Sequence, residues 1–573
     1  MPHATLPPPG FQALILCGPG VSLNTFTSNP KEFPKALVPI ANRPMVWYPL
    51  DWCYRMGVTD ITLITPPESA PALETALAQN PHLTALPAPR PEIVAPEGLT
   101  QTTGTGEIFR FLEVQKVIKS DFILLPCDLI CELDGSALLE AWMVLEAGLG
   151  SATGGIADSA LAPVSLGGEK SGRRGGLGVW YPVKGLEGIS MQGEETDFIA
   201  TTALPPSVVP PPEGSPRSEI HKLVLSIPTD TVKDLTEEHS NQFPIRHSLL
   251  KKHGRIKVKT SHRDAHIYVF PFWVLEMMRK NEFDSVAEDV LGWWAKAGWQ
   301  YGLGDKFGLR EILQGKQKAS ETEDGMISSG QLEDNIDLAS LSTTHTTTIA
   351  RPVQHDPDAF ASRVPNAAKP MFGQQAPLMI PPLLAYVQRS SAPPTSTDLK
   401  LIRRVDTREL LLSVSLRLAK LPPITETSSP FAHAAKIATP ELLPQRSRVE
   451  ATDCLLADNV AVSERVNIKE CVIGAGCSIG AGSRLTRCLL MDGVTVGENV
   501  QLSGCIVGRR ARIDGGGAKD EDKTKLTDCD VQGSFAVEWG TEAKNEKFMV
   551  FEGLSDEGSF EDVEGDEAGT TID

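Results

Sequence analysis

The chain has 573 residues, of which 41% are apolar, so we expect a soluble globular protein with at least two hydrophobic cores. Its formal net charge of −19 argues against direct binding of duplex nucleic acid, because that affinity comes from Lys and Arg that neutralise phosphates. A local basic patch is compatible with this total. No apolar run is long enough to cross a membrane, the first residues lack the pattern of a signal peptide, and the ten cysteines include no CxxC pair, so we expect a protein of the cytoplasm (cytosol) with reduced thiols.

Strands and helices alternate in the first part of the chain. Short apolar runs predict strands at residues 11–17, 59–65 and 122–126, and the segments between them predict helices at 44–55, 67–79, 104–120 and 136–147. This alternation indicates a largely parallel sheet with helices on both faces. The ligand crevice of such a sheet lies beyond the carboxyl ends of its strands, where the loops after Cys17 and Pro126 are expected.

The regular pattern is interrupted further along the chain. A Pro- and Ser-rich stretch at 202–217 predicts a disordered insert in an α/β domain that spans 11–310. Regular structure is expected to resume at 257–270 and to continue in two helices that end near Trp299, with Trp293 and Trp294 interpreted as packing residues. We expect residues 311–450 to form a largely irregular linker, most clearly at 314–377, with a strand or a helix at 398–421. The stretch 552–573 holds nine Asp or Glu and no Lys or Arg, which predicts a disordered acidic tail.

A period of 17 residues runs through the region before this tail. Its apolar positions are spaced by 6, 6 and 5 residues and are Val462, Ile468, Ile473, Ile479, Leu485, Leu490, Val496, Leu502, Val507 and Ile513. Glycines follow several of them, as in the hexapeptide repeats of β-helices. The sequence therefore predicts a left-handed parallel β-helix over 451–551, with three sides per coil and apolar side chains pointing inward.

The cysteines provide an independent check of this period. Cys454, Cys471, Cys488 and Cys505 are each 17 residues apart, and Cys529 follows after 24, which is one coil plus a seven-residue insertion. Stacked metal ligands or redox pairs are one interpretation of such a ladder. We favour small side chains stacked in equivalent positions, because no histidine accompanies them.

A glycine-rich loop follows the first strand. The segments LCGPGVSL at 16–23 and FPKALVPIANRPM at 33–45 resemble the signature of sugar-nucleotide pyrophosphorylases, a family of nucleotidyltransferases. The resemblance implies an α/β, Rossmann-like domain with a mixed sheet, in which the amides of Gly18 and Gly20 approach phosphate oxygens and Lys35 neutralises their charge.

Several residues depart from that signature. Val21 stands where the family has threonine, Ser22 stands where it has its catalytic arginine, and Pro19 supplies no amide donor. Losing one preorganised charge-stabilising group typically costs about 100- to 1000-fold in rate. We therefore expect no catalytic residues in this chain, and Lys35 is as well explained as a structural or solvated lysine.

Asp128 matches the carboxylate with which these enzymes hold Mg²⁺, although Cys127 replaces the preceding glycine. Gly104 and Thr105 match a Gly-Thr pair that lies near the nucleotide base. The Trp-x-Asp-x-Gly-Thr segment that brings a second carboxylate is not recognisable, and one carboxylate is a poor Mg²⁺ site. We thus expect neither metal nor cofactor, but a vestigial nucleotide cleft formed by Gly18, Gly20, Lys35, Gly104, Thr105 and Asp128.

Four segments resemble the gamma-subunit family of eukaryotic translation initiation factor 2B. They are FQA at 11–13, PKALVPIANRPMVWYP at 34–49, CDLI at 127–130 and DAHIY at 264–268, where His266 replaces a glycine of the active transferases. The resemblance implies a structural and regulatory subunit without enzymatic activity of its own. It would pair with the epsilon subunit, join the beta and delta subunits and the alpha dimer in a decamer, and help to bind initiation factor 2 for guanine-nucleotide exchange.

Three hypotheses remain open at this point. The first hypothesis is the gamma-type subunit of the exchange factor. The epsilon subunit is a rival for this role, and the acidic tail argues against it because epsilon continues into a helical-repeat domain. The second hypothesis is a working mannose-1-phosphate guanylyltransferase. The third is a regulatory paralogue that binds a sugar nucleotide without turning it over.

Overall fold

The computed structural model describes residues 10–18, 21–100, 102–146, 175–186, 188–189, 194–205, 210–212, 214–314, 378, 380–390, 399–516 and 523–550. The chain divides into two compact units, Met1–Lys436 and Ile437–Asp573, and each is described by itself. No helix within the described ranges is both long enough and apolar enough to span a membrane.

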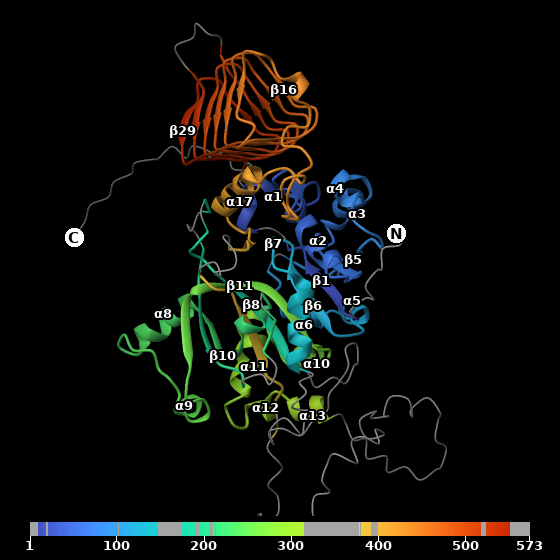
Figure 1. Ribbon diagram of the computed structural model, residues 1–573, viewed down its shortest axis with the longest axis vertical. Helices are drawn as coiled ribbons and strands as arrows, with labels where there is room; N and C mark the ends of the chain where they lie inside the picture. The colour runs from blue at the N-terminus through green and yellow to red at the C-terminus, as the bar shows by residue number, and fades with distance from the viewer. Residues whose placement is uncertain are drawn as a thin grey trace, which may run out of the picture. The chain divides into compact units, whose positions relative to one another are not determined.

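One half of the sheet in the first unit is parallel (Figure 1). Its four strands have the spatial order β5-β4-β1-β6 and are β1 (Gln12–Leu16), β4 (Asp60–Ile64), β5 (Glu92–Val94) and β6 (Phe122–Pro126). Leu16 pairs in register with Ile64 and Pro126, so three neighbouring strands end at one edge. These elements confirm the strands predicted at 11–17, 59–65 and 122–126.

Helices cover this parallel half. They are α2 (Trp47–Arg55), α3 (Ala70–Gln79), α5 (Leu112–Val117) and α6 (Gly135–Glu146), with shorter turns at η1 (Val21–Leu23), α1 (Asn24–Thr27), η2 (Lys35–Leu37), α4 (Pro81–Thr84) and η3 (Glu107–Arg110). The helix predicted from Pro44 begins at Trp47 instead, because β3 (Arg43–Pro44) pairs with β2 (Pro39–Ile40). The helix predicted at 104–120 is broken at Phe111, whose backbone is extended.

The other half of the sheet is mainly antiparallel, so the sheet is mixed. The spatial order continues from β6 through β11 (Lys257–Phe270), β8 (Gly176–Pro182), β12 (Leu383–Val387), β10 (Ile220–Pro228) and β9 (Asp197–Thr202). The first part of β11 also pairs with β9. Strand β12 runs parallel to β8 and antiparallel to β10.

The range 311–450, which we expected to be largely irregular, contributes three elements to this unit. Strand β12 lies inside the sheet with all five residues buried, because Leu383–Val387 is apolar throughout. Strand β13 (Ile402–Arg404) pairs with β7 (Leu129–Cys131), and helix α17 (Arg408–Lys420) follows it. The segment 398–421 is therefore a strand and then a helix, and residues 315–377 lie outside the described part.

The predicted insert at 202–217 is only partly irregular. Strand β9 ends at Thr202 and η4 (Pro216–Glu219) precedes β10, while 206–209 and 213 are not described. The elements that follow are α8 (Thr229–Glu238), α9 (His247–Lys252), α10 (Trp273–Lys280), η5 (Val286–Val290), α11 (Leu291–Ala297), α12 (Leu303–Lys306) and α13 (Leu309–Gln314).

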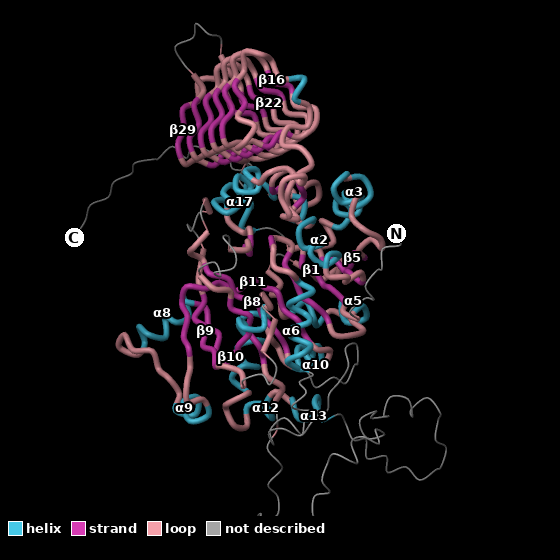
Figure 2. The backbone as a smooth tube through the Cα atoms, viewed as in Figure 1, coloured by secondary structure: helices cyan, strands magenta, loops and turns pink. Residues whose placement is uncertain are grey.

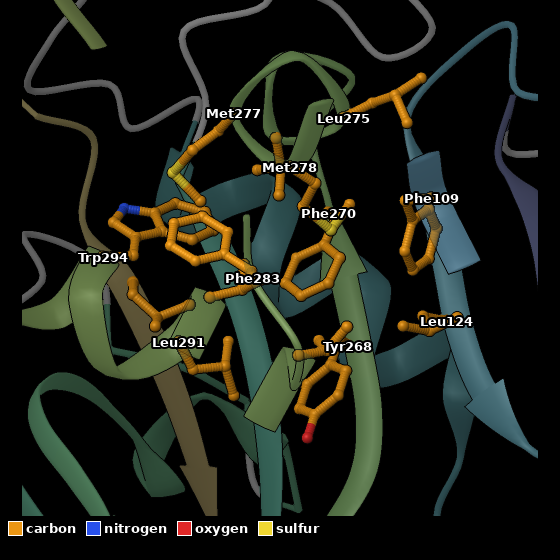
Figure 3. Packing of buried hydrophobic residues seen from close by; sticks show 14 of the residues in the cluster. Phe109, Leu124, Tyr268, Phe270, Leu275, Met277, Met278, Phe283, Leu291 and Trp294 are labelled. Atoms are coloured by element: carbon orange, nitrogen blue, oxygen red, sulfur yellow. The ribbon is translucent and has the colours of Figure 1, made fainter. Parts of the chain in front are cut away.

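Aromatic side chains from β11 and the helices after it fill the core of this unit (Figure 3). Trp294 is buried with its ring centroid 4.8 Å from that of Trp273, and its Nε1 donates a hydrogen bond to the carbonyl of Pro381 at 2.9 Å. Trp293 packs on Phe307 with centroids 5.5 Å apart. Both tryptophans are packing residues, as predicted.

Three parallel sheets of very short strands make up the second unit, drawn in magenta in Figure 2. One sheet holds β14 (Arg448–Val449), β17 (Asn467–Lys469), β20 (Arg484–Thr486), β23 (Gln501–Ser503), β26 (Lys525–Thr527) and β29 (Glu542–Lys544). The second holds β15 (Leu455–Leu456), β18 (Val472–Ile473), β21 (Leu489–Leu490), β24 (Ile506–Val507), β27 (Asp530–Val531) and β30 (Lys547–Phe548). The third holds β16 (Ala461–Val462), β19 (Ser478–Ile479), β22 (Thr495–Val496), β25 (Arg512–Ile513) and β28 (Ala536–Val537).

The registers of these sheets confirm the 17-residue period. Ile468 pairs with Leu485, Leu485 with Leu502, and Leu502 with Leu526, which is one coil plus the seven-residue insertion. All ten apolar positions of the predicted repeat are buried. The first strand lies just ahead of residue 451, and the predicted acidic tail lies outside the described residues.

Close stacking of the coils explains the glycines at one corner. A Cβ on Gly480 would lie 2.4 Å from the carbonyl carbon of Gly497, and a Cβ on Gly497 would lie 2.4 Å from the amide nitrogen of Gly515. The five stacked cysteines are fully buried, and their thiols contact backbone carbonyls, as Cys471 does at Lys469 over 3.1 Å. Burial raises the pKa of Cys488, which keeps this thiol protonated.

Candidate functional site

The site forms at the edge where β1 and β6 end. The chain leaves β1 at Cys17 and Gly18 and leaves β6 at Cys127 and Asp128, and the amide of Cys127 donates to the carbonyl of Leu16 at 3.0 Å. The structure thus places Gly18, where the glycine loop begins, and Asp128 at one edge, as the parallel register predicts.

Lys35 and Asp128 form a buried ion pair. The Lys35 Nζ lies 2.7 Å from Asp128 Oδ2, and the two side chains are only 13% and 3% exposed. Burial alone would raise the pKa of Asp128, but the charges of Lys35 and Arg404 hold it below its ordinary value. Burial alone would lower the pKa of Lys35, and Asp128 holds it above its ordinary value. Lys35 is therefore a charged partner of Asp128 and is not a solvated surface lysine.

Arg404 is a second cation on the same carboxylate. Its Nε lies 3.9 Å from Asp128 Oδ1, and the amide of Val405 donates to the carbonyl of Asp128 at 2.8 Å. Strand β13 brings Arg404 here by pairing with β7, which directly follows Asp128. Burial alone would lower the pKa of Arg404, and Asp128 and Asp406 raise it. Asp128 consequently lies between two cations of its own chain.

A second carboxylate joins this cluster, although the sequence interpretation did not find one. Asp406 Oδ2 lies 3.2 Å from Arg404 Nη2, and both oxygens of Asp406 accept hydrogen bonds from Arg263, at 3.1 and 2.6 Å. The sequence does contain a signal for a helix start here, because Asp406 and Thr407 are capping residue types that precede an apolar helical run. The structure shows this cap, since Thr407 Oγ1 accepts a hydrogen bond from the amide of Leu410.

These two carboxylates do not fit a divalent metal ion. The guanidinium of Arg404 lies against both Asp128 and Asp406, so a protein cation already neutralises the charge that a metal would neutralise. Asp128 Oδ1 and Arg404 Nε are both buried and lack a hydrogen bond within the described structure, so the guanidinium faces this oxygen as a charge. No group of three or more His, Cys, Asp or Glu side chains in these ranges has the arrangement of a metal site.

His266 closes the other side of Arg404. Its backbone has φ +53°, in the left-handed region where the transferases that it resembles have glycine. Its Nε2 lies 2.9 Å from Arg404 Nη1. Burial, and after it the charge of Arg404, lowers the pKa of His266 well below its ordinary value, so the neutral ring accepts this hydrogen bond. The imidazole thus takes space that a glycine would leave empty.

Gly104 and Thr105 support a neighbouring loop. A Cβ on Gly104 would lie 2.2 Å from the carbonyl oxygen of Asp284, and Thr105 Oγ1 accepts a hydrogen bond from the amide of Val286 at 3.0 Å. Within the described residues, no hydrogen bond or ion pair joins Gly104 or Thr105 to Lys35 or Asp128. Their contacts are therefore structural.

The glycine loop itself is open at its described end. A Cβ on Gly18 would meet no atom within 4 Å, and Ser22 is exposed in η1. Gly20 lies outside the described residues. Where the related transferases have an arginine, this chain offers only a hydroxyl.

Two more carboxylates lie close together on β9 and β11. The amide of Asp264 donates to Asp197 Oδ2 at 2.6 Å, and the hydroxyl of Tyr268 donates to Asp264 Oδ2 at 2.6 Å. Burial and the charge of Asp197 raise the pKa of Asp264 to about 7. Burial raises the pKa of Asp197 to about 6. Sequence reasoning missed this pair, because strand pairing joins residues from distant segments.

Two family models match separate parts of the chain. The model described as nucleotidyl transferase matches residues 15–163, which include Lys35 and Asp128. The model described as GMPPB C-terminal domain matches residues 447–531, within the three-sheet unit.

Two kinds of known protein are similar to parts of this chain. Translation initiation factor eIF2B subunit gamma of Schizosaccharomyces pombe is 27% identical over 336 residues, which cover 57% of this chain and 60% of that protein. Glucose-1-phosphate thymidylyltransferases of two Mycobacterium tuberculosis strains are 41% identical over 49 residues, which cover 9% of this chain and 17% of each enzyme. The chain thus spans less than two thirds of each relative. It combines a nucleotidyltransferase domain with a following region of three parallel sheets that is consistent with a β-helix.

Proposed function

We propose that this chain is a non-catalytic structural and regulatory subunit of the guanine-nucleotide exchange factor for translation initiation factor 2. It pairs with the epsilon subunit and joins the beta and delta subunits and the alpha dimer in a decameric assembly in the cytosol. It helps to bind the substrate factor there. The 336-residue similarity to the fission-yeast gamma subunit supports this proposal.

The observation that carries the non-catalytic part is the pairing of Asp128 with Lys35 and Arg404. A nucleotidyl transfer needs a cation that stabilises charge on the phosphates in the transition state. Here Lys35 already pairs with a carboxylate, and Ser22 supplies no charge. Cations of the chain itself therefore balance the charge of Asp128, and no free cation is left in the described cleft to stabilise a phosphate, which favours a scaffold over an enzyme.

A second candidate is a pyrophosphorylase of the mannose-1-phosphate guanylyltransferase type, or its regulatory paralogue. The match of residues 447–531 to the GMPPB C-terminal domain favours it. The pairing of Asp128 with Lys35 and Arg404 disfavours the working enzyme but is compatible with a regulatory paralogue that does not turn over a sugar nucleotide.

Affinity purification of the endogenous full-length chain, followed by quantitative mass spectrometry, separates these functions. The exchange-factor proposal predicts stoichiometric recovery of the epsilon subunit, with the beta, delta and alpha subunits and initiation factor 2 at lower yield. Recovery of a guanylyltransferase without epsilon would overturn it in favour of the paralogue.

A reconstituted exchange assay tests the role of the cleft. GDP release from initiation factor 2 is expected to fall when this chain is omitted from the assembly. It is expected to stay within about twofold of wild type with Asp128→Asn, which retains an oxygen toward Lys35 but removes the carboxylate charge. Loss of exchange activity in an intact Asp128→Asn assembly would show that the cleft takes part in the reaction.

A further inference from the structure

One stretch of the first unit carries only positive charge. Residues 239–263 contain no Asp or Glu, and their Lys and Arg residues are Arg246, Lys251, Lys252, Arg255, Lys257, Lys259 and Arg263. Of these, Arg263 is buried in the candidate site. Arg246 directly precedes α9, and the other five lie on α9, on the turn after it and at the start of β11. This is a local reversal of sign in a chain whose net charge is −19.

The stretch belongs to an extension of the sheet with a small core of its own. Ala200, Val224, Leu225, Leu249 and Trp299 form this core, and Leu249 is the residue through which α9 is buried in it. Lys252 Nζ donates to the carbonyl of Gly298 at 2.8 Å. Figure 1 shows α9 at the end of this extension, away from β1 and β6, so the surface is separate from the cleft.

The exposed cations are not balanced by neighbouring carboxylates. Lys251, Arg255 and Lys257 are exposed and form no ion pair among the residues that the structure describes. Two neighbouring histidines, His253 and His221, are affected by the same positive charge. Burial, and then Lys222 and Lys252, lower the pKa of His253, and burial, and then Lys257 and Lys259, lower the pKa of His221.

Apolar and aromatic side chains are exposed among these cations. Ile245, Leu250 and Val258 are 55%, 52% and 51% exposed, and Leu250 directly follows the buried Leu249. Tyr301 is 92% exposed and follows Gln300, whose Oε1 accepts from Arg246 Nη1 at 3.0 Å. Tyr and Arg are enriched in protein interfaces, and interfaces combine apolar centres with charged rims.

We propose that this surface, named the α9 surface and defined by Arg246, Leu250, Lys251, Lys252, Arg255 and Lys257, binds an acidic segment of a partner protein that also carries apolar side chains. Carboxylates of the segment pair with the cations, and an apolar side chain of the segment covers Leu250. Phosphates of a nucleic acid satisfy only the cations and leave Leu250 in water, so a protein segment fits better. The proposal does not depend on the function of the cleft.

Fluorescence anisotropy with the purified full-length chain tests this. The probe is a labelled 20-residue peptide of Asp and Glu with Leu or Phe at every fourth position. Its Asn and Gln counterpart and a single-stranded 20-nucleotide RNA are run beside it. We expect the acidic peptide to bind at least about tenfold more tightly than the neutral peptide or the RNA, and to weaken as salt rises from 0.05 to 0.5 M.

Three variants locate the binding. The reversal K251E/R255E/K257E changes exposed, unpaired side chains and is expected to weaken peptide binding at least about tenfold. Leu250→Ser is expected to weaken it about threefold. The matched reversal K469E/R484E/K544E on exposed positions of the β-helix is expected to change it less than twofold.

The opposite results would overturn the proposal. Equal peptide affinity for wild type and K251E/R255E/K257E, or no peptide binding at 1 mM, would show that the α9 surface does not bind such segments. RNA binding as tight as peptide binding, lost in the same variant, would assign the surface to nucleic acid instead. Circular dichroism of each variant confirms that it remains folded.

Discussion

The guanidinium of Arg404 and the carboxylate of Asp128 face each other with 3.9 Å between Nε and Oδ1, and neither of these atoms has a hydrogen-bond partner among the described residues. On its far side the same guanidinium contacts Asp406. An arginine side chain thus lies where two carboxylates converge.

Removal of this arginine should open the cleft to metal. We expect Arg404→Ala to bind Mn²⁺ at least about tenfold more tightly than wild type, because Asp128 and Asp406 lose their shared cation. It should also destabilise the first unit by about 1–3 kcal/mol, since Asp128 and Asp406 lose a shared cation, although Asp128 keeps Lys35 and Asp406 keeps Arg263 as partners. Isothermal calorimetry and urea denaturation measure the two effects. Arg55→Ala, which breaks a surface pair with Asp51, is the control, and equal Mn²⁺ affinity in wild type and Arg404→Ala would contradict this role.

The Asp197–Asp264 pair should make stability depend on pH. Their folded-state pKa values of about 6 and about 7 lie above those of an unfolded chain, so the folded protein binds more protons between about pH 4 and 7. The pair's contribution to the free energy of unfolding therefore falls as the pH rises through this window. We expect Asp264→Asn to gain on the order of 2 kcal/mol relative to wild type between pH 5 and pH 7.5. Urea denaturation at both pH values checks this, and a constant difference between the two proteins would refute it.

Local repeats and strand ends could be predicted from the sequence. The 17-residue period predicted the three-sheet region, because every coil repeats the same inward apolar positions, from Ile468 to Ile513. The place of Asp128 followed from the apolar run that ends at Pro126.

Long-range pairing could not be predicted in the same way. Strand β12 is apolar throughout, but nothing local indicates that it enters the sheet between β8 and β10. The pairing of β13 with β7 likewise decides that Arg404 reaches Asp128. The sequence therefore predicted the residues of the candidate site that follow β1 and β6, but not Arg404 and Asp406, which β13 brings to it.

The positive φ of His266 should restrict what can replace it. A β-branched residue is strained at φ +53°, so His266→Val is expected to destabilise the first unit by about 2–3 kcal/mol. His266→Gly should stay within about 1 kcal/mol of wild type, because relief of strain offsets the lost contact with Arg404. Urea denaturation of both variants tests this order. A His266→Val protein as stable as His266→Gly would show that the backbone is not constrained there.

Gly480 should tolerate no side chain, because a Cβ there would lie 2.4 Å from Gly497. We expect Gly480→Ala to destabilise the β-helix by about 2–3 kcal/mol. Gly476→Ala is the matched control, since its Cβ would meet no atom within 4 Å and only its φ of +67° opposes the change, at about 1 kcal/mol. Thermal unfolding followed by circular dichroism compares them. Equal midpoints for the two variants would contradict the close approach of the coils.

Pyrophosphate release by the purified chain tests most directly whether the cleft is inactive. The assay supplies Mg²⁺, a nucleoside triphosphate and a sugar 1-phosphate, with GTP and mannose 1-phosphate first, and includes Ser22→Arg beside wild type. With Asp128 held by Lys35 and Arg404, we predict no release above the protein-free background for either protein. Turnover of wild type at an ordinary enzymatic rate of about 1–10 per second would contradict this.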